Sequence, residues 1–345
     1  MDSNRDIALP AADKTSQPVV MSGMRPTGKL HLGHYMGVLK NWLWLQNEKK
    51  VPCFFSIANW HALTTKNTPE ETAQLKTHIT NMALDWLAAG LDPEKVTLFV
   101  QSDVPEIAEL HLLLSMITPA KWVQTDPTLK DMVAMLSDDL SYGLLGYPVL
   151  QTVDILSVKA THVPVGKDQL AHLEISRDIA KRFNHQFKTK LFAEPRPLLT
   201  ETPLLMGLDG RKMGKSFNNA IFLSDTAEET FKKIKTATTD PKRVKRNDPG
   251  EPNDCQVVYP YYQVFTSKET IGLTEKECRE AKRGCMDCKK QLSDAINTML
   301  APLRQRRQEF EQNKADVQAI LAAGGKKARK KVQETLDAVK PLMGV

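Results

Sequence analysis

Two short loops carry residue types that suit a phosphate ligand. The first holds His31, Gly33 and His34 at the start of an expected helix, just after a short apolar run. Two imidazoles three positions apart on a first helical turn point to one side, and the glycine between them lets a flat or phosphorylated ligand approach the backbone. The helix N-terminus also favours anions. The alternative is a turn whose histidines merely face solvent, and the spacing around a glycine favours binding.

The second loop spans residues 210–216 and has the sequence GRKMGKS. Lys212 and Lys215 stand three positions apart in it, so two point charges can meet a polyphosphate. Alone, such a loop is usually solvated surface. Together, the two loops predict a site that handles the phosphates of a nucleotide.

Four of the five cysteines fall in one window with the spacing C-x22-C-x6-C-x2-C, namely Cys255, Cys278, Cys285 and Cys288. Two ligands two residues apart can hold one metal, and the long loop brings the first ligand back to it. Without an export signal, a disulfide framework is not expected. Thiolates suit zinc or an iron–sulfur cluster, and residue chemistry alone favours zinc. Four unligated thiols are the remaining alternative.

The overall composition is that of an ordinary globular protein. The chain has 345 residues, of which 41% are hydrophobic and 26% charged, and 47 Lys and Arg against 41 Asp and Glu give a net charge of +6. That length predicts two domains, or one large domain with an insertion. No long apolar stretch or apolar leader occurs, so we expect no membrane span and a cytoplasmic location. The net charge is compatible with a nucleic-acid partner.

The hydrophobic pattern indicates which elements position the loops. We predict a disordered tail over 1–17, strands at 19–21, 53–58 and 96–100, and helices over 31–45 and 69–89. Strands that alternate with helices predict an α/β fold, a Rossmann-like doubly wound parallel sheet. We expect a helical insertion over about 106–145, strands at 149–156 and 162–165, and a helix over 169–183. The sheet-containing domain would therefore span 18–223.

The remaining segment, 224–345, is predicted to be a helical domain. Its clearest element is an amphipathic helix through Leu292, Ile296, Met299 and Leu303, bent or restarted near Pro302.

The two loops together resemble the HIGH and KMSKS signatures of class I aminoacyl-tRNA synthetases. The flanking sequence is similar to the tryptophanyl-tRNA synthetase family in SGMRPTG at 22–28, WHALTT at 60–65, YPVLQ and DIL within 147–156, and VPVG and DQ within 163–169. The resemblance runs from about Val19 to the C-terminus. It implies an ATP- and Mg²⁺-dependent homodimer that joins L-tryptophan to tRNA(Trp) through a tryptophanyl-adenylate.

The resemblance also implies roles for single residues. The residues that would carry the catalysis are His31, His34, Lys130, Lys212 and Lys215. Those that would bind ATP are Arg25, Gly33, His34, Gly166, Asp168, Lys212 and Lys215. Within these sets, Gly33 leaves room for the adenine and Asp168 binds the ribose hydroxyls. Lys130 aligns with a lysine that reaches ATP, and an exposed helix lysine is its alternative.

For tryptophan, the resemblance implies a pocket in which Asp154 accepts a hydrogen bond from the indole N–H. Tyr147 and Gln169 would hold the α-amino group, and the other lining residues would be Met21, Gly23, His61 and Gln151. A buried acceptor strengthens the binding of an indole and weakens the binding of analogues that lack the N–H. The alternative for Asp154 is a strand-end carboxylate that caps a turn.

A subset of this family carries a 4Fe–4S cluster at the same cysteine spacing, beside the surface where the anticodon docks. The resemblance therefore favours a 4Fe–4S cluster at the four cysteines, with zinc as the second choice. Seven Lys and Arg against two Asp between 231 and 250 predict a surface for tRNA phosphates.

Three positions depart from the family pattern. Gly214 replaces a serine, Lys167 replaces a glutamate and Thr125 replaces an arginine. These departures leave open a catalytically weak, tRNA-binding or regulatory paralogue. A tyrosyl relative is a further alternative, because Tyr147, Gln151 and Asp154 could also surround a phenol, although Trp60, His61 and the segment 166–169 favour tryptophan. A cytidylyltransferase is another, which the indole-pocket residues and the long helical C-terminal part disfavour.

Overall fold

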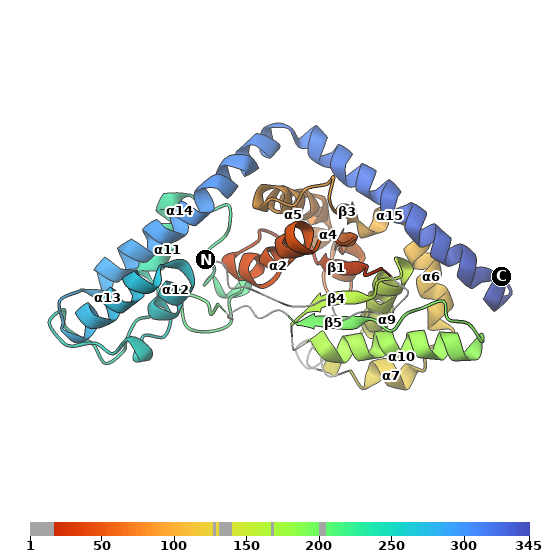
Figure 1. The fold of residues 1–345 in the computed structure, drawn as a ribbon, viewed down its shortest axis with the longest axis horizontal. Coiled ribbons are helices and arrows are strands. Elements are labelled where there is room, and N and C mark those ends of the chain that lie inside the picture. The colour runs from red at the N-terminus through yellow and green to blue at the C-terminus, as the bar shows by residue number, and fades with distance from the viewer. Residues whose placement is uncertain (1–16, 127–128, 131–139, 167–168, 200–204) are drawn as a thin grey trace.

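The computed structural model describes residues 17–126, 129–130, 140–166, 169–199 and 205–345. Within these residues five parallel strands form one sheet: β1 (Val20–Met24), β2 (Cys53–Ile57), β3 (Thr97–Val100), β4 (His162–Val165) and β5 (Arg196–Leu199). They lie in the order β3-β2-β1-β4-β5 (Figure 1). The predicted Rossmann-like α/β class is confirmed. The strand order changes direction between β1 and β4, where parallel sheets place their ligands.

Helices cover both faces of the sheet, because side chains alternate along each strand. Val20, Phe55 and Leu98 pack into one apolar core, whereas Met21 and Phe99 pack into the other. The first core contains residues of α1 (Leu32–His34), the π-helical η1 (Tyr35–Leu39), α2 (Lys40–Trp44), η2 (Leu45–Lys49), α5 (Leu75–Ala89) and α14 (Cys285–Gln312). The second contains residues of α6 (Glu106–Ser115), α7 (Ala120–Gln124), α9 (Tyr142–Ser157), α10 (Leu170–Gln186) and α15 (Lys314–Met343).

The structure differs from the prediction in three places. The segment 149–156 is not a strand but the second half of α9, which Ser141 caps by accepting a hydrogen bond from the Leu144 N–H at 3.1 Å. A short apolar run fits a buried helix as well as a strand, so its sequence could not decide between them. The edge strand β5 was not predicted, since Pro197 lies within it. Helix α14 continues through Pro302 without a restart.

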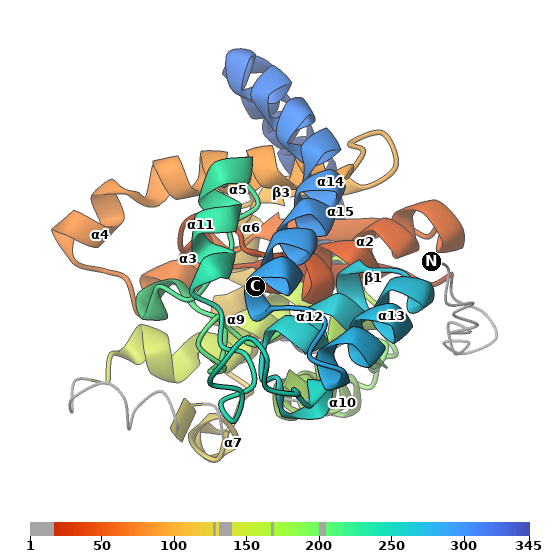
Figure 2. The same cartoon turned by 90° about the vertical axis from the view of Figure 1, so that its left-hand side faces the viewer.

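The two C-terminal helices form an inverted V over the rest of the chain (Figure 1). Helix α15 lies along β3, and the contact is so close that a Cβ on Gly324 would meet the Leu98 carbonyl oxygen at 1.8 Å. Helices α11 (Ala227–Lys235) and α12 (Val258–Phe265) pack on α14 (Figure 2). The predicted helical region from 224 thus packs on α5 through α14 and on β3 through α15, and the boundary at 223 stays a prediction.

The remaining described elements are α3 (Asn59–Leu63), α4 (Pro69–Ala73), η3 (Gln101–Asp103), η5 (Lys215–Phe217), η6 (Pro252–Asp254) and α13 (Lys268–Arg279). No helix in the described part of the chain has the length and apolar character needed to cross a bilayer. The predicted tail, except for Gln17, lies outside the described residues.

Candidate active site

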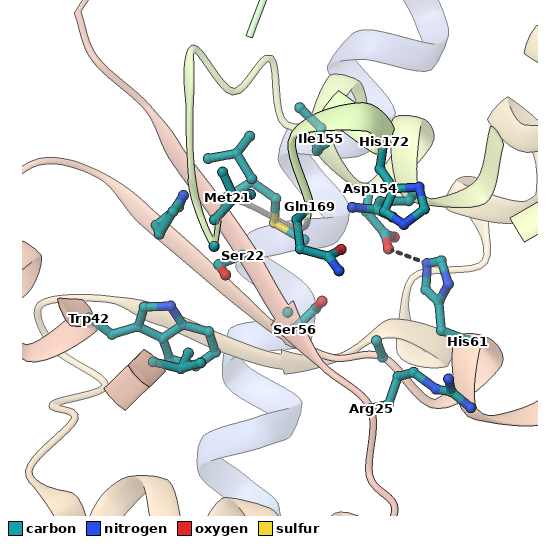
Figure 3. A pocket seen from close by; sticks show the side chains of 18 of the residues that line it. Met21, Ser22, Arg25, Trp42, Ser56, His61, Asp154, Ile155, Gln169 and His172 are labelled. Atoms are coloured by element: carbon teal, nitrogen blue, oxygen red, sulfur yellow. Dashed lines mark hydrogen bonds and ion pairs between the residues drawn. The ribbon is translucent and has the colours of Figure 1, made fainter. Parts of the chain in front are cut away.

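A cavity of about 380 Å³ opens at the carboxyl ends of β1 and β4 (Figure 3). It lies at the switch in strand order, where a ligand is expected in this kind of sheet. All seven residues predicted for the tryptophan pocket line it: Met21, Gly23, His61, Tyr147, Gln151, Asp154 and Gln169. Two residues of the predicted ATP set, Arg25 and Gly166, also line it. Their roles stay predictions, but the structure brings these residues together.

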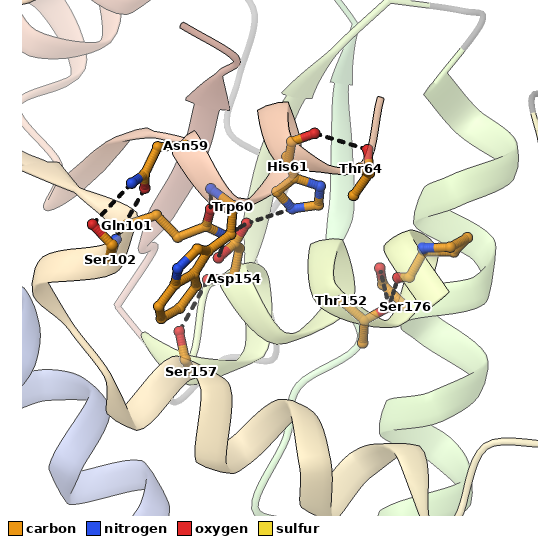
Figure 4. Close-up of polar contacts among 11 residues, drawn as sticks. Asn59, Trp60, His61, Thr64, Gln101, Ser102, Thr152, Asp154, Ser157 and Ser176 are labelled. Carbon is orange, nitrogen blue, oxygen red and sulfur yellow. Dashed lines mark hydrogen bonds and ion pairs between the residues drawn. The ribbon is translucent and has the colours of Figure 1, made fainter. Parts of the chain in front are cut away.

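Asp154 is a buried acid in the wall of the cavity. It is 7% exposed and projects from α9, within a helix rather than at the end of a strand. Its carboxylate accepts hydrogen bonds from Gln101 Nε2 at 2.8 and 3.0 Å and lies 3.0 Å from His61 Nε2 (Figure 4). A carboxylate offers about four acceptor sites, so acceptor capacity remains for a ligand N–H.

Gln101 is a functional candidate that the sequence did not reveal. It lies in η3, directly after β3, and is fully buried. The Trp60 N–H donates to Gln101 Oε1 at 3.1 Å, which turns Nε2 toward Asp154. Its position directly after the carboxyl end of a parallel strand was the only available signal.

A second buried network fixes Tyr147. Its hydroxyl lies 3.2 Å from His172 Nε2, and His172 Nδ1 pairs with Asp126 Oδ2 at 2.7 Å. His172 and Asp126 are each 2% exposed. His172 also lines the cavity, a position that the sequence did not reveal. The pair holds the Tyr147 ring against the wall.

The histidine loop has the geometry expected of a phosphate site. The His31 and His34 rings stack with their centroids 3.7 Å apart, and the His31 N–H donates to His34 Nδ1 at 3.2 Å. Burial and the nearby charge of Lys215 lower the pKa of His31 to about 4. Burial and the charges of His31 and Lys215 lower the pKa of His34 to about 3. Both rings are therefore neutral near pH 7 and offer N–H donors rather than charge. The same helical segment continues into the cavity wall at Gly37 and Asn41.

The lysine loop folds over the histidine loop. Lys215 Nζ lies 3.4 Å from Thr27 Oγ1, and burial lowers the pKa of Lys215 to about 8. Asn219 anchors the loop, because its Oδ1 accepts from the Gly214 N–H at 2.9 Å and its Nδ2 donates to the Lys212 carbonyl at 3.1 Å. The two predicted motifs therefore meet in space.

Other predicted ATP residues stand as follows. Lys212 and Lys130 are exposed, and Lys130 lies in a short described stretch between gaps. Asp168 and Lys167 lie outside the described residues.

A Cβ on Gly33 would come within 3.1 Å of the His31 ring, so this glycine also permits the stacking of the two rings. His78 of α5, which the sequence analysis missed, lies near Gly28 and Lys215, and burial lowers its pKa.

The four clustered cysteines line one separate small cavity, about 30 Å³ in volume. All are free thiols, and Arg243 Nη1 lies 3.7 Å from Cys278 Sγ. The described residues contain no group of three or more His, Cys, Asp or Glu side chains placed to hold a metal ion. The predicted four come together around one space, but not in the geometry of a single-ion site.

A family model described as tRNA synthetases class I (W and Y) matches residues 13–301. The chain belongs to this family. This class I synthetase is 40% identical to the tryptophan–tRNA ligase of Aquifex aeolicus, over 94% of this chain and 99% of that one. It is 43% identical to the tryptophan–tRNA ligase of Thermotoga maritima, over 94% and 99% of the two chains.

A solved structure supports the same assignment. The tryptophanyl-tRNA synthetase of Campylobacter jejuni, described as complexed with ADP and Tryptophane, superposes on this synthetase with a TM-score of 0.86 at 31% identity. The match covers 94% of this chain and 99% of that one.

Proposed function

We propose that this chain is an aminoacyl-tRNA ligase that joins L-tryptophan to tRNA(Trp) in two steps, the first of which consumes ATP. The observation that carries the proposal is the buried Asp154 carboxylate, which has spare acceptor capacity in a cavity beside the two phosphate loops. The tryptophan–tRNA ligases among its relatives support tryptophan over tyrosine.

In the first step a carboxylate oxygen of tryptophan attacks the α-phosphorus of ATP, and the bond from that phosphorus to pyrophosphate breaks. The protein must place the reactants and stabilise the growing charge on pyrophosphate. Neutral His31 and His34 would donate N–H groups to the phosphates, while Lys212 and Lys215 would supply charge. Mg²⁺ bound with ATP would neutralise part of the phosphate charge beside these lysines.

In the second step a hydroxyl of the terminal tRNA ribose attacks the carbonyl carbon of the adenylate, and AMP leaves. Asp154 would hold the indole N–H through both steps, while Tyr147 and Gln169 hold the α-amino group. Fixed contacts at both ends of tryptophan keep its carboxyl group in line with the phosphate.

The Gly214 substitution does not remove the anchor of the lysine loop. Its backbone N–H is bonded to Asn219, so the loop is held without a serine hydroxyl. Thr125 is exposed and hydrogen-bonded to carbonyls of its own helix. The anchored lysine loop supports an active synthetase over the weak paralogue that the substitutions left open, while Lys167 lies outside the described residues.

For the cysteine cavity we propose a 4Fe–4S cluster held by Cys255, Cys278, Cys285 and Cys288, with zinc as the second choice. Four thiols around one space fit such a group. A single zinc with sulfurs at about 2.3 Å would need the four thiols close together, whereas a cubane cluster holds them further apart. When bound, the cluster would cross-link the 240–255 loop to the start of α14.

For tRNA(Trp) we propose the basic surface beside this cavity. Lys233 and Lys242 are already paired with Asp225 and Asp254. Lys232, Lys235 and Lys245 are exposed and make no ion pair with another described residue, so they are the lysines we propose for the phosphates. A homodimer is supported by the exposed apolar side chains of Leu112, Met116 and Tyr142 on neighbouring parts of α6 and α9. The tRNA and ATP that the reaction uses support the cytoplasm as its location.

The test is ATP–pyrophosphate exchange with each of tryptophan, tyrosine and phenylalanine. We expect exchange that depends on tryptophan. Exchange with tyrosine alone would indicate the tyrosyl alternative, and tRNA binding without any exchange would indicate the regulatory one.

A further inference from the structure

One buried ion pair joins helix α14 to helix α5. Arg307, 8% exposed, donates from Nε to Asp85 Oδ1 at 2.8 Å and from Nη2 to Asn81 Oδ1 at 2.9 Å. Its Nη1 donates to Glu311 at 3.1 Å. Asp85 is 1% exposed, so its charge depends on this partner rather than on water.

The other oxygen of Asp85 faces the histidine loop. Asp85 Oδ2 accepts a hydrogen bond from the Leu30 N–H at 3.2 Å, and Leu30 directly precedes His31. The rest of the loop is held by the segment after the lysine loop, because the Leu32 N–H donates to the Ile221 carbonyl and the Leu223 N–H to the Leu30 carbonyl, both at 2.9 Å. Asp85 thus supplies a side-chain contact that holds the histidine loop from the side of α5.

Asp85 also acts on the lysine loop. Burial lowers the pKa of Lys215, and the charge of Asp85 opposes that shift. Burial raises the pKa of Asp85 itself, and Arg307 opposes that shift in turn. Loss of Arg307 would therefore raise the pKa of Asp85 and weaken the anionic acceptor of the Leu30 N–H.

Helix α14 extends this chain of contacts to the cysteine cavity. Cys285 and Cys288 stand on its first turn and line that cavity, and Arg307 stands 19 residues after Cys288, about 28 Å along the helix at 1.5 Å per residue. One rigid element thus runs from the proposed cluster to the loop that would hold ATP.

We propose that Asp85 and Arg307 are positioning residues for ATP, which make the geometry of the His31–His34 loop depend on α14. The inference rests on the proposed activation of tryptophan by ATP. The pair touches no substrate and acts through the backbone of Leu30.

The first test is Asp85→Asn, which is nearly isosteric. An amide has one oxygen, so either Arg307 or the Leu30 N–H must face its NH₂ group. We expect the KM for ATP to rise and kcat of pyrophosphate exchange to fall, together lowering kcat/KM for ATP by about 10- to 100-fold, with the KM for tryptophan unchanged. Arg307→Met should give the same pattern, and combining both changes should add little.

A second variant separates this effect from misfolding. Asp85→Leu with Arg307→Met replaces the buried pair by apolar side chains, which proteins tolerate better than one unpaired charge. We expect its thermal unfolding to stay close to that of the unmodified chain and its kcat/KM for ATP to stay low, because Leu30 still lacks its acceptor. The matched control is Arg306→Met, which removes a contact from α14 to the Ala88 carbonyl of α5 at 2.7 Å but none to Asp85.

The outcomes are distinct. Unchanged ATP kinetics in folded Asp85→Asn and in the double variant would overturn the proposal, and so would an equal loss in Arg306→Met. Calorimetric titration of ATP gives a readout that does not need catalysis. If the unmodified chain shows no exchange but ATP affinity falls in both variants and not in the control, the proposed function fails and the positioning role stands.

Discussion

Replacing Asp154 with alanine should remove the preference for an indole. The side chain is 7% exposed, so water cannot readily replace the lost acceptor. A hydrogen bond to a charged group is worth about 1.5–3 kcal/mol, which corresponds to roughly 10- to 150-fold in kcat/KM for tryptophan. Phenylalanine has no N–H to lose, and its own kcat/KM should change little. The tryptophan-to-phenylalanine ratio should therefore fall by that factor.

The assay is pyrophosphate exchange with tryptophan, tyrosine and phenylalanine, in parallel with thermal unfolding. Ser157→Ala is the matched control, because the Ser157 hydroxyl donates to the Asp154 main-chain carbonyl at 3.1 Å and not to the carboxylate. Gln101→Leu should be intermediate, since Asp154 keeps its charge but loses a partner that orients it. An unchanged tryptophan-to-phenylalanine ratio in folded Asp154→Ala protein would remove this residue from indole recognition.

Three further predictions concern the loops and the cysteine cavity. His34→Ala and Lys215→Ala should each lower kcat for adenylate formation far more than they weaken tryptophan binding, as measured by exchange kinetics and calorimetry. The pKa of Lys215 is lowered to about 8, so the free enzyme loses that charge as pH rises through 8, and kcat/KM for ATP should fall above pH 8. Lys215→Arg should shift this fall in the pH profile to higher pH, because arginine stays charged. A fall at unchanged pH in Lys215→Arg would assign it to another group. Cys285→Ser should lose the cluster, as measured by the absorbance of anaerobically purified protein, and should keep tryptophan activation while charging of tRNA falls. Full charging by the metal-free variant would exclude the cluster from tRNA recognition.

Periodic, local features of the chain were predictable from the sequence. The strand–loop–helix around His31 and the later parallel strands follow from apolar runs and glycine positions, because these signals lie within a few residues of each other. The run at 149–156 was misassigned, since over eight residues its mostly buried apolar positions fit a helix as well as a strand. Asp154 nevertheless reaches the cavity, as the family resemblance implied.

Contacts between distant segments could not be predicted in this way. Gln101 meets Asp154, and Arg307 meets Asp85, only after the sheet and α14 have formed. No spacing rule connects positions that far apart. Residues of this kind are the ones that the structure adds to the site.

The central claim is tested most directly by charging purified tRNA(Trp) with labelled tryptophan in the presence of ATP, with tyrosine and tRNA(Tyr) in the matching reactions. We predict an acid-precipitable product from tryptophan and tRNA(Trp) only, formed after tryptophan-dependent pyrophosphate exchange. Charging of tRNA(Tyr) with tyrosine, or tRNA binding with no charged product, would contradict it.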